Sequence, residues 1–391
     1  MEGDFIKIRE SLLPLSWLYG GAVKLRNFCF DIGLLKSKSF SVPVIAVGNI
    51  TVGGTGKTPH VEYLVRLLGE KSKVAVLSRG YKRKKKGYVK ADETSTARDI
   101  GDEPMQMKSK FKNITVAVDK KRVHGIKQLT ADDENLDVIL LDDAFQHRYV
   151  KPGVNILLVD YHRLIIYDKL LPAGRLREPL RGKDRADIVI VTKCPKELKP
   201  MEFRVIRKAL DLYPYQHLYF TTLDYDTPYT VFDGKEADGD IISGKNILLL
   251  TGIASPRQIE EDISHQFRPI SLTSFAFPDH HAFRSKDIEQ INQTFDSMEG
   301  PKVIITTEKD MVRLKQAEGL SSEVKRHLYA LPVRISFMQD EQKEKFDSFI
   351  QGYVLKNSRN SILAQGKEEH KTHTKTATTE KTTKTISFRN N

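Results

Sequence analysis

The sequence has few cysteines and no long run of uncharged apolar residues. Its 391 residues include only Cys29 and Cys194, too few for a disulfide framework and without metal-ligand spacing, which is typical of a reducing compartment such as the cytoplasm. The most apolar stretch, residues 12–35, is interrupted by two basic residues and one acidic residue. It is therefore too broken to cross a bilayer as a helix, and it lacks the pattern of a cleaved signal peptide.

The composition indicates a folded protein with an anionic partner. Hydrophobic residues make up 39% and charged residues 29%, which is ordinary for a globular protein, and the length allows two packed domains. A net charge of +12 favours a nucleotide, a phosphorylated substrate, an acidic membrane or a nucleic acid. Because no nucleic-acid-binding module is recognisable, nucleic acid is not an expected partner.

A glycine-rich stretch predicts a nucleotide site. Residues 48–59, GNITVGGTGKTP, follow an apolar run and precede a helical pattern, and such a turn directs backbone N–H groups and a helix dipole at phosphate. The usual phosphate loop has glycine where Thr51 stands, six residues before Lys57. Lys57 is expected to reach the outer phosphates and Thr58 to place its hydroxyl on Mg²⁺. The residues expected to contact the nucleotide are Thr51, Val52, Gly53, Gly54, Thr55, Gly56, Lys57 and Thr58.

Apolar, β-branched runs alternate with helical or polar stretches after this loop. They occupy residues 74–77, 114–118, 138–141, 156–159 and 188–191. This alternation predicts an α/β protein like the P-loop NTPases, with a mostly parallel sheet covered by helices on both faces. Ligands of such sheets bind beyond the carboxyl ends of the strands.

Charged residues follow several of these runs. Asp142 and Asp143 end the run at 138–141, where a carboxylate of a phosphate-loop protein holds Mg²⁺; the alternative is an acidic N-cap. The Pro/Gly-punctuated segment 170–181 carries three arginines, whose planar groups suit phosphate oxygens, and Glu178 within it is a further candidate metal ligand. The two carboxylates at 102 and 103 indicate, by themselves, a helix cap.

The N-terminal segment has an apolar stripe at helical spacing. Its members recur at alternating steps of three and four, and they are Leu15, Leu18, Ala22, Leu25, Cys29 and Ile32. Such a helix can lie in a membrane interface. Packing against the protein's own core explains the pattern equally well.

Six motifs occur together in one order. They are TVGGTGKTP at 51–59, SRGY at 78–81, GDEP at 101–104, DDAFQHR at 142–148, LPAGRLREP at 171–179 and FPDHH at 277–281. This set, spanning roughly residues 10–350, resembles the tetraacyldisaccharide 4′-kinase family, the lipid A 4′-kinases of Gram-negative bacteria. The familiar acidic motif has glycine where Ala144 stands, a small-for-small change that leaves the carboxylates in place.

The resemblance implies transfer of the γ-phosphoryl group of ATP to the 4′-hydroxyl of tetraacyldisaccharide 1-phosphate, with Mg²⁺, at the cytoplasmic face of the bacterial inner membrane. It assigns Asp102 and its partner His280 to activation of the sugar hydroxyl, with His281 as the alternative histidine, and it replaces the capping interpretation of Asp102. By the same matching, Arg122 and Arg177 resemble phosphate-contacting arginines. The metal candidates are Thr58, Asp142, Asp143 and Glu178.

These features divide the chain into five expected parts. Residues 1–35 form a membrane-associating helical segment, 36–223 the kinase core, 224–240 a linker, 241–355 a smaller α/β domain, and 356–391 a disordered basic tail with few large apolar residues. Lys57 and His280 fall in different domains, so the reactive groups are expected to meet across a cleft that domain closure completes. The oligomeric state is left open.

Two other classes share part of this pattern. A GTP-dependent switch or metallochaperone ATPase would have the same phosphate loop, but the segment VTKCP at 191–195 has proline where guanine recognition usually requires aspartate. A nucleotide-gated membrane scaffold without catalytic activity is separated from a kinase by label transfer from ATP to the lipid.

Overall fold

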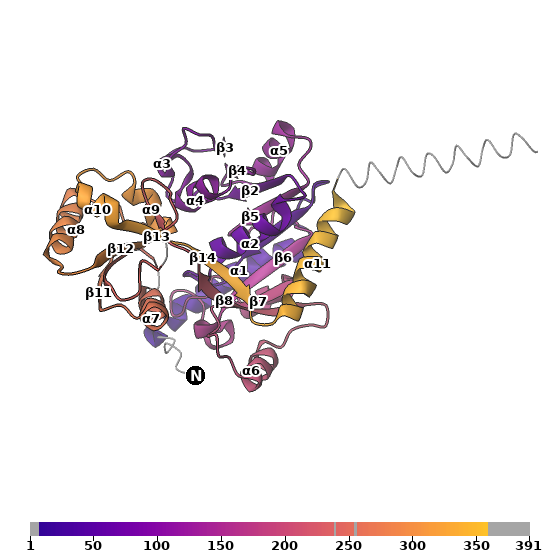
Figure 1. Cartoon of the computed structure of the whole chain (residues 1–391). Helices are drawn as coiled ribbons and strands as arrows, with labels where there is room; N and C mark the ends of the chain where they lie inside the picture. Colours follow the sequence, from indigo (N-terminus) through magenta and orange to yellow (C-terminus); the bar gives the residue numbers. More distant parts are fainter. Residues whose placement is uncertain (1–7, 238–239, 254–255, 359–391) are drawn as a thin grey trace, which may run out of the picture.

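The computed structural model describes residues 8–237, 240–253 and 256–358. Within these ranges the chain forms two sheets with separate cores, and the smaller domain stands beside the larger one (Figure 1). No helix in the described ranges is long and apolar enough to span a membrane.

The larger domain is built on a nine-stranded, mostly parallel sheet. Its strands in spatial order are β14 (Val333–Phe337), β8 (His217–Tyr225), β7 (Ile188–Thr192), β6 (Val154–Asp160), β1 (Val44–Gly48), β5 (Val138–Asp142), β2 (Val74–Ser78), β4 (Thr115–Val118) and β3 (Val89–Lys90). The pairs β14–β8 and β3–β4 are antiparallel. The five runs predicted from the sequence all lie in strands of this sheet.

Helices cover both faces because alternate strand residues point in opposite directions. On β1, Ile45 and Val47 join the core beneath α2 (Lys57–Gly69), α4 (Asp102–Lys110) and α11 (Asp340–Asn357). Val44 and Ala46 face α5 (Arg122–Asp132), and a third core lies beneath α6 (Pro200–Leu210). The predicted α/β fold with helices on both faces is therefore confirmed. The remaining elements of this domain are α3 (Ala97–Ile100), η2 (Tyr161–Arg163), η3 (Ile165–Tyr167) and η4 (Leu180–Arg185).

The smaller domain has a five-stranded sheet of its own. Its order is β11 (Ser271–Ala276), β10 (Asn246–Thr251), β12 (Lys302–Thr307), β13 (Leu328–Leu331) and β9 (Tyr229–Thr230). The helices α8 (Ser285–Ser297), α9 (Glu308–Leu314) and α10 (Ser322–His327) pack on one face, and α7 (Pro256–Phe267) packs on the other.

The structure differs from the expected boundaries in two places. The segment expected to be a linker, 224–240, contains β9, which pairs with β13 at the edge of the smaller sheet, and Val231 is fully buried. Residues 333–355, expected in the smaller domain, return to the larger one: β14 pairs with β8, and α11 packs Phe346, Ile350 and Val354 into the main core. An apolar run indicates a strand but not which sheet will accept it. The expected tail lies outside the described residues from 359 onward, and α11 runs to Asn357.

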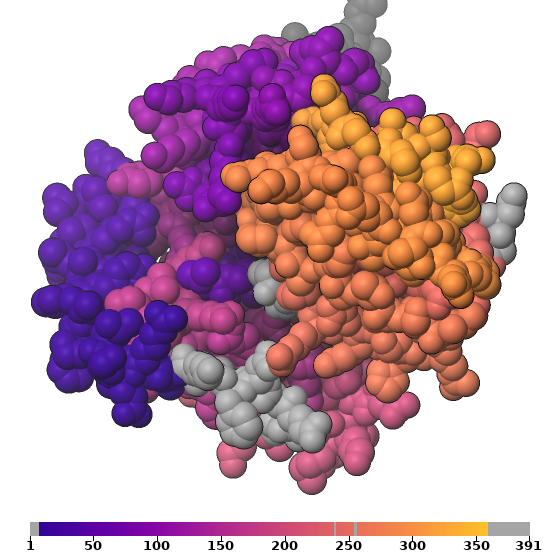
Figure 2. All heavy atoms as spheres, turned by 90° about the vertical axis from the view of Figure 1, so that its left-hand side faces the viewer, coloured from indigo at the N-terminus to yellow at the C-terminus, as the bar shows by residue number. Residues whose placement is uncertain are grey.

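The N-terminal helix α1 (Leu13–Asp31), preceded by η1 (Glu10–Leu12), packs by its small and polar side. Ser16 and Gly20 are buried, and a Cβ at Gly20 would come within 2.7 Å of Leu170. The predicted stripe largely faces outward, where Leu18, Leu25 and Ile32 are exposed. Figure 2 shows this helical segment, in indigo, separated from the smaller domain, in orange, by a hollow in the surface.

Candidate active site

The phosphate loop connects the end of β1 to the first residue of α2, as the sequence predicts. Gly53 and Gly56 have φ values of 126° and 75°, in the region that favours glycine. Inside the turn, the Asn49 side chain donates to Thr55 Oγ1 at 2.8 Å. His60, in the first turn of α2, contacts the carbonyl of Gly56 through Nδ1 at 2.7 Å. These contacts shape the loop around its backbone N–H groups.

The arginine-rich segment 170–181 lies against the phosphate loop. The backbone N–H of Val52 donates to the carbonyl of Arg175 at 2.8 Å, and that of Arg177 donates to the carbonyl of Ile50 at 2.7 Å. Thr51 forms an isolated bridge with Leu176. The structure therefore brings Arg177 to the nucleotide loop, although more than a hundred residues of chain separate the two segments.

Two carboxylates stand at the carboxyl end of β5. Asp142 is buried, accepts a hydrogen bond from Ser78 Oγ at 3.3 Å, and keeps its Oδ1 without a partner. Burial raises the pKa of Asp142 to about 6, and the negative charge of Asp143 is the second largest cause. Asp143 has φ 47° and lies 3.6 Å from Lys57 Nζ and 3.7 Å from Arg177. Burial alone would raise the pKa of Asp143, but these cations lower it.

This arrangement fits a divalent cation. A buried carboxylate oxygen that lacks a hydrogen-bond partner offers a hard oxygen ligand of the kind Mg²⁺ prefers. Thr58, the second residue of α2, follows the phosphate loop at the end of β1, the strand that pairs with β5. Asp142, Asp143 and Thr58 are therefore the residues that would hold the ion.

Two predicted site residues have other partners. Glu178 is buried, and both of its carboxylate oxygens accept from Arg185, at 2.9 and 3.0 Å. This ion pair holds the carboxylate in the structure, and the role of Glu178 as a metal ligand stays a prediction. Arg122 donates to the backbone carbonyls of Asp119 and Asp142, at 2.7 and 3.0 Å. It therefore braces the acidic strand end, and burial lowers its pKa to about 10.

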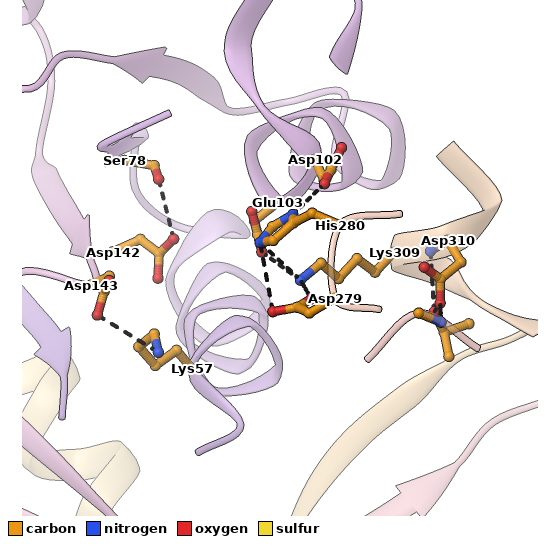
Figure 3. Close-up of polar contacts among 12 residues, drawn as sticks. Lys57, Ser78, Asp102, Glu103, Asp142, Asp143, Asp279, His280, Lys309 and Asp310 are labelled. Atoms are coloured by element: carbon orange, nitrogen blue, oxygen red, sulfur yellow. Dashed lines mark hydrogen bonds and ion pairs between the residues drawn. The ribbon is translucent and has the colours of Figure 1, made fainter. Parts of the chain in front are cut away.

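The second cluster joins the two domains (Figure 3). Asp102 is the first residue of α4 in the larger domain, and His280 follows β11 in the smaller one. His280 Nδ1 lies 2.6 Å from Asp102 Oδ2, and both side chains are buried. Since an ionised carboxylate only accepts, Nδ1 carries the proton of this hydrogen bond, and Nε2 lies on the opposite side of the ring. The ring of Tyr81 lies against the imidazole, with ring centroids 5.2 Å apart.

The Nε2 side of His280 faces a group of charges. Lys309 Nζ lies 3.5 Å away, and carboxylate oxygens of Glu103 and Asp279 each lie 3.8 Å away. Lys309 also pairs with Glu103 at 3.0 Å and with Asp279 at 2.8 Å. The charge of Glu103 is a further cause of the raised pKa of Asp142, which relates this cluster electrostatically to the acidic strand end.

His281 is placed differently. Its Nε2 contacts Asp287 at 2.9 Å, and its ring stacks on Phe277 with centroids 4.8 Å apart. Of the two adjacent histidines, His280 is the one in contact with Asp102.

Sequence reasoning missed Arg313, which donates to both oxygens of Asp102, at 2.9 and 2.6 Å. The available signal was weak: Arg313 stands four residues after Lys309, and both lie on the same side of α9. It also missed Lys110, which lies 2.7 Å from Glu62 and 2.6 Å from Glu308.

A parallel sheet with a phosphate loop, an acidic strand end and a carboxylate–histidine pair beside them defines a nucleotide-dependent phosphotransferase of the P-loop class. Residues 8–352 match the family described as Tetraacyldisaccharide-1-P 4′-kinase. The chain belongs to this family and is a kinase.

Individual relatives agree with this assignment. The Tetraacyldisaccharide 4′-kinase of Phocaeicola vulgatus is 56% identical over 366 residues, covering 92% of this chain and 99% of the relative. That of Bacteroides thetaiotaomicron is 51% identical over 381 residues, covering 95% and 100%. A crystal structure of LpxK from Aquifex aeolicus in complex with ATP superimposes with a TM-score of 0.68 at 30% identity, covering 88% of this chain and 99% of that one. These findings do not favour the switch or scaffold alternatives.

Proposed function

We propose that this protein transfers the γ-phosphoryl group of ATP to the 4′-hydroxyl of tetraacyldisaccharide 1-phosphate in lipid A biosynthesis. Family membership supports the donor and the acceptor. The observation that carries the mechanism is the contact between Asp102 and His280, which joins the two domains at a site related electrostatically to the acidic strand end.

His280 is the proposed base. Asp102 holds the imidazole with Nδ1 protonated, so Nε2 accepts the proton of the 4′-hydroxyl as its oxygen attacks the γ-phosphorus. The bond from the γ-phosphorus to the bridging oxygen breaks, and ADP leaves. Lys309, 3.5 Å from Nε2, places a positive charge beside the developing phosphate ester.

We propose that the cations around Asp143 neutralise the negative charge of the ATP phosphates. Lys57 and Arg177 both lie within 4 Å of its carboxylate, at 3.6 and 3.7 Å, and their side chains are available to the β- and γ-phosphate oxygens. Mg²⁺ bound by Asp142, Asp143 and Thr58 would supply further charge neutralisation. We propose that Arg122 supports the position of Asp142, because it donates to the backbone carbonyls of Asp119 and Asp142.

We further propose that α1 lies on the cytoplasmic surface of the inner membrane. Trp17, Leu18 and Leu25 are 73%, 74% and 65% exposed. Single exposed apolar residues are ordinary on a protein surface, whereas several large ones on one helix are typical of a membrane or protein interaction site. The opposite side of α1 contacts the arginine-rich segment: Ser16 Oγ donates to Leu170 O at 3.0 Å, and Tyr19 donates to the carbonyl of Arg177 at 2.7 Å. A membrane-bound α1 would thus hold the segment that carries Arg177 near the lipid substrate.

Incubating the purified protein with γ-labelled ATP, Mg²⁺ and detergent-dispersed tetraacyldisaccharide 1-phosphate tests the reaction. Label is expected in the lipid, at the 4′ position. Release of labelled inorganic phosphate without label in the lipid would contradict it and would favour a switch or scaffold.

A further inference from the structure

Arg313 holds both members of the Asp102–His280 pair in place. Its guanidinium donates to Asp102 Oδ1 at 2.9 Å through Nε and to Oδ2 at 2.6 Å through Nη2. Its third nitrogen, Nη1, donates to the backbone carbonyl of His281 at 2.7 Å. One side chain therefore fixes the carboxylate on α4 and the chain segment that carries His280.

The helix that carries Arg313, α9, is anchored at its first turn. The helix α9 begins with Thr307 as N-cap, whose hydroxyl oxygen accepts from the backbone N–H of Asp310 at 3.1 Å. The buried carboxylate of Asp310 accepts from the backbone N–H of Gly252 at 2.8 Å, which ties the start of α9 to the end of β10. A side chain on such an anchored helix places its charge more reproducibly than one on a loop.

Two further ion pairs dock α9 on α4. Lys309 pairs with Glu103 at 3.0 Å, and Glu308 pairs with Lys110 at 2.6 Å. The pair between Arg313 and Asp102 is the third and the most geometrically specific, because a guanidinium fork matches two carboxylate oxygens at once. Within the described residues, α9 therefore connects the smaller domain to the helix bearing Asp102 by three ion pairs, beside the contact that His280 makes.

We propose that Arg313 is a positioning residue for phosphoryl transfer: it orients Asp102 and holds the His280 segment so that the imidazole faces the acceptor hydroxyl. The inference rests on the proposed function and adds to it a residue outside the nucleotide and metal sites. Arg313 contacts no group assigned to ATP or Mg²⁺, so its removal is expected to slow the chemical step and leave nucleotide binding intact.

The contact with Arg313 also affects the ionisation of Asp102. Burial alone would raise the pKa of Asp102, but hydrogen bonds from His280 and Arg313 outweigh it and lower the value. Arg313 therefore keeps the carboxylate ionised as an acceptor for the imidazole. Facing the other side of the ring are Glu103, Asp279, Lys309 and Tyr81.

The test compares full-length variants by label transfer, ATP affinity and thermal unfolding. Arg313→Gln is expected to lower kcat by about 10- to 100-fold, the scale on which misplacement of a reacting group acts, with the Kd for ATP within about twofold of wild type. Arg313→Lys keeps the charge but loses the fork, and we expect an intermediate kcat. The matched control is Arg326→Gln, since Arg326 pairs with the nearby Glu323 on α10, far from Asp102 in the described contacts, and should behave like wild type.

A double-mutant cycle separates positioning from a merely structural role. Added to Asp102→Asn, Arg313→Gln should cost almost nothing further, because residues that act as one unit are strongly non-additive. Multiplicative losses, a wild-type kcat in Arg313→Lys, or a loss of kcat that tracks loss of folded protein would overturn the inference. If wild type itself transfers no label to the lipid, the proposed function fails and the inference with it; if wild type is active and Arg313→Gln is unchanged, only the inference fails.

Discussion

The carboxylate of Asp102 accepts a hydrogen bond from Nδ1 of His280 at 2.6 Å across 178 residues of sequence. The two side chains belong to different domains, so the pair exists only while α4 and the segment after β11 stay together. Sequence analysis predicted that domain closure would be needed to assemble the reactive groups. For Asp102 and His280 the structure shows the contact already made, which makes the interface between the domains part of the site.

Replacing Asp142 by asparagine tests the acidic strand end. The change keeps the size of the side chain and removes the charge, so Asp142→Asn is expected to lower kcat by at least about 100-fold, as loss of a preorganised charge does. It should also abolish the rise in Tm that Mg²⁺ gives wild type with ATP. Asp226→Asn, at an exposed ion pair with Arg334, is the control. Near-normal turnover with an unchanged Mg²⁺ effect would remove Asp142 from the metal site.

Replacing Lys110 tests an ion pair that joins the domains. Lys110 lies between Glu62 and Glu308, both buried, so Lys110→Met leaves Glu308 without its cation and leaves Glu62 with Arg66 as its cation. Breaking such a pair costs about 3–5 kcal/mol, measured as the free energy of unfolding in urea. Lys108→Met is the matched control on the same helix, since its partner Glu93 is 92% exposed and the expected loss is below about 1 kcal/mol. Equal losses in the two variants would contradict this account.

The acid sensitivity of the fold is expected to depend on His60. Burial lowers its pKa from 6.5 to about 4, because the interior disfavours the charged ring, and this outweighs the contact with the carbonyl of Gly56, which raises the pKa. The unfolded state binds a proton below pH 6.5 and the folded state does not, so stability is complete above pH 6.5 and falls as the pH drops toward 4. The contribution is on the order of 3 kcal/mol. Urea unfolding at pH 7.5 and 4.5 should show a smaller loss in His60→Gln, and equal losses would refute the assignment.

The single tryptophan reports on membrane contact. Trp17 lies on the exposed side of α1, so vesicles of anionic phospholipid are expected to shift its emission to shorter wavelength. Leu18→Ser combined with Leu25→Ser should weaken vesicle binding at least about fivefold without lowering Tm, since both residues are exposed. Leu355→Ser, at an exposed position on α11, is the control. Unchanged binding in the double variant would contradict membrane docking through α1.

The larger part of the fold follows from local patterns. The runs at 74–77, 138–141 and 188–191 are strands because β-branched residues buried on both faces suit a parallel sheet. The strand–loop–helix around Lys57 also carries its own signal. The return of β14 and α11 to the larger sheet could not be predicted, since it depends on which strand edge is available for pairing in the tertiary structure.

The site was only partly accessible from the sequence. Asp142 and Lys57 stand in local motifs, whereas the pairing of Asp102 with His280 came from resemblance to a family and not from spacing. Arg313 and Lys110 could not be found because a charged residue on a helix surface looks the same whether it faces solvent or another domain. For Glu178, the loop predicts a metal ligand, and the structure pairs its carboxylate with Arg185; its role at the metal stays a prediction.

Joint action of Asp102 and His280 on the acceptor hydroxyl is tested most directly by single-turnover kinetics. Transfer from ATP to tetraacyldisaccharide 1-phosphate is measured in Asp102→Asn, in His280→Gln and in the variant carrying both changes. If the two residues act as one unit on the acceptor hydroxyl, each single change should slow transfer by at least about 100-fold, the double change should be no slower than the worse single one, and the Kd for ATP should stay within about threefold of wild type. Losses that multiply in the double variant, or a tenfold weaker Kd with an unchanged rate, would contradict the claim.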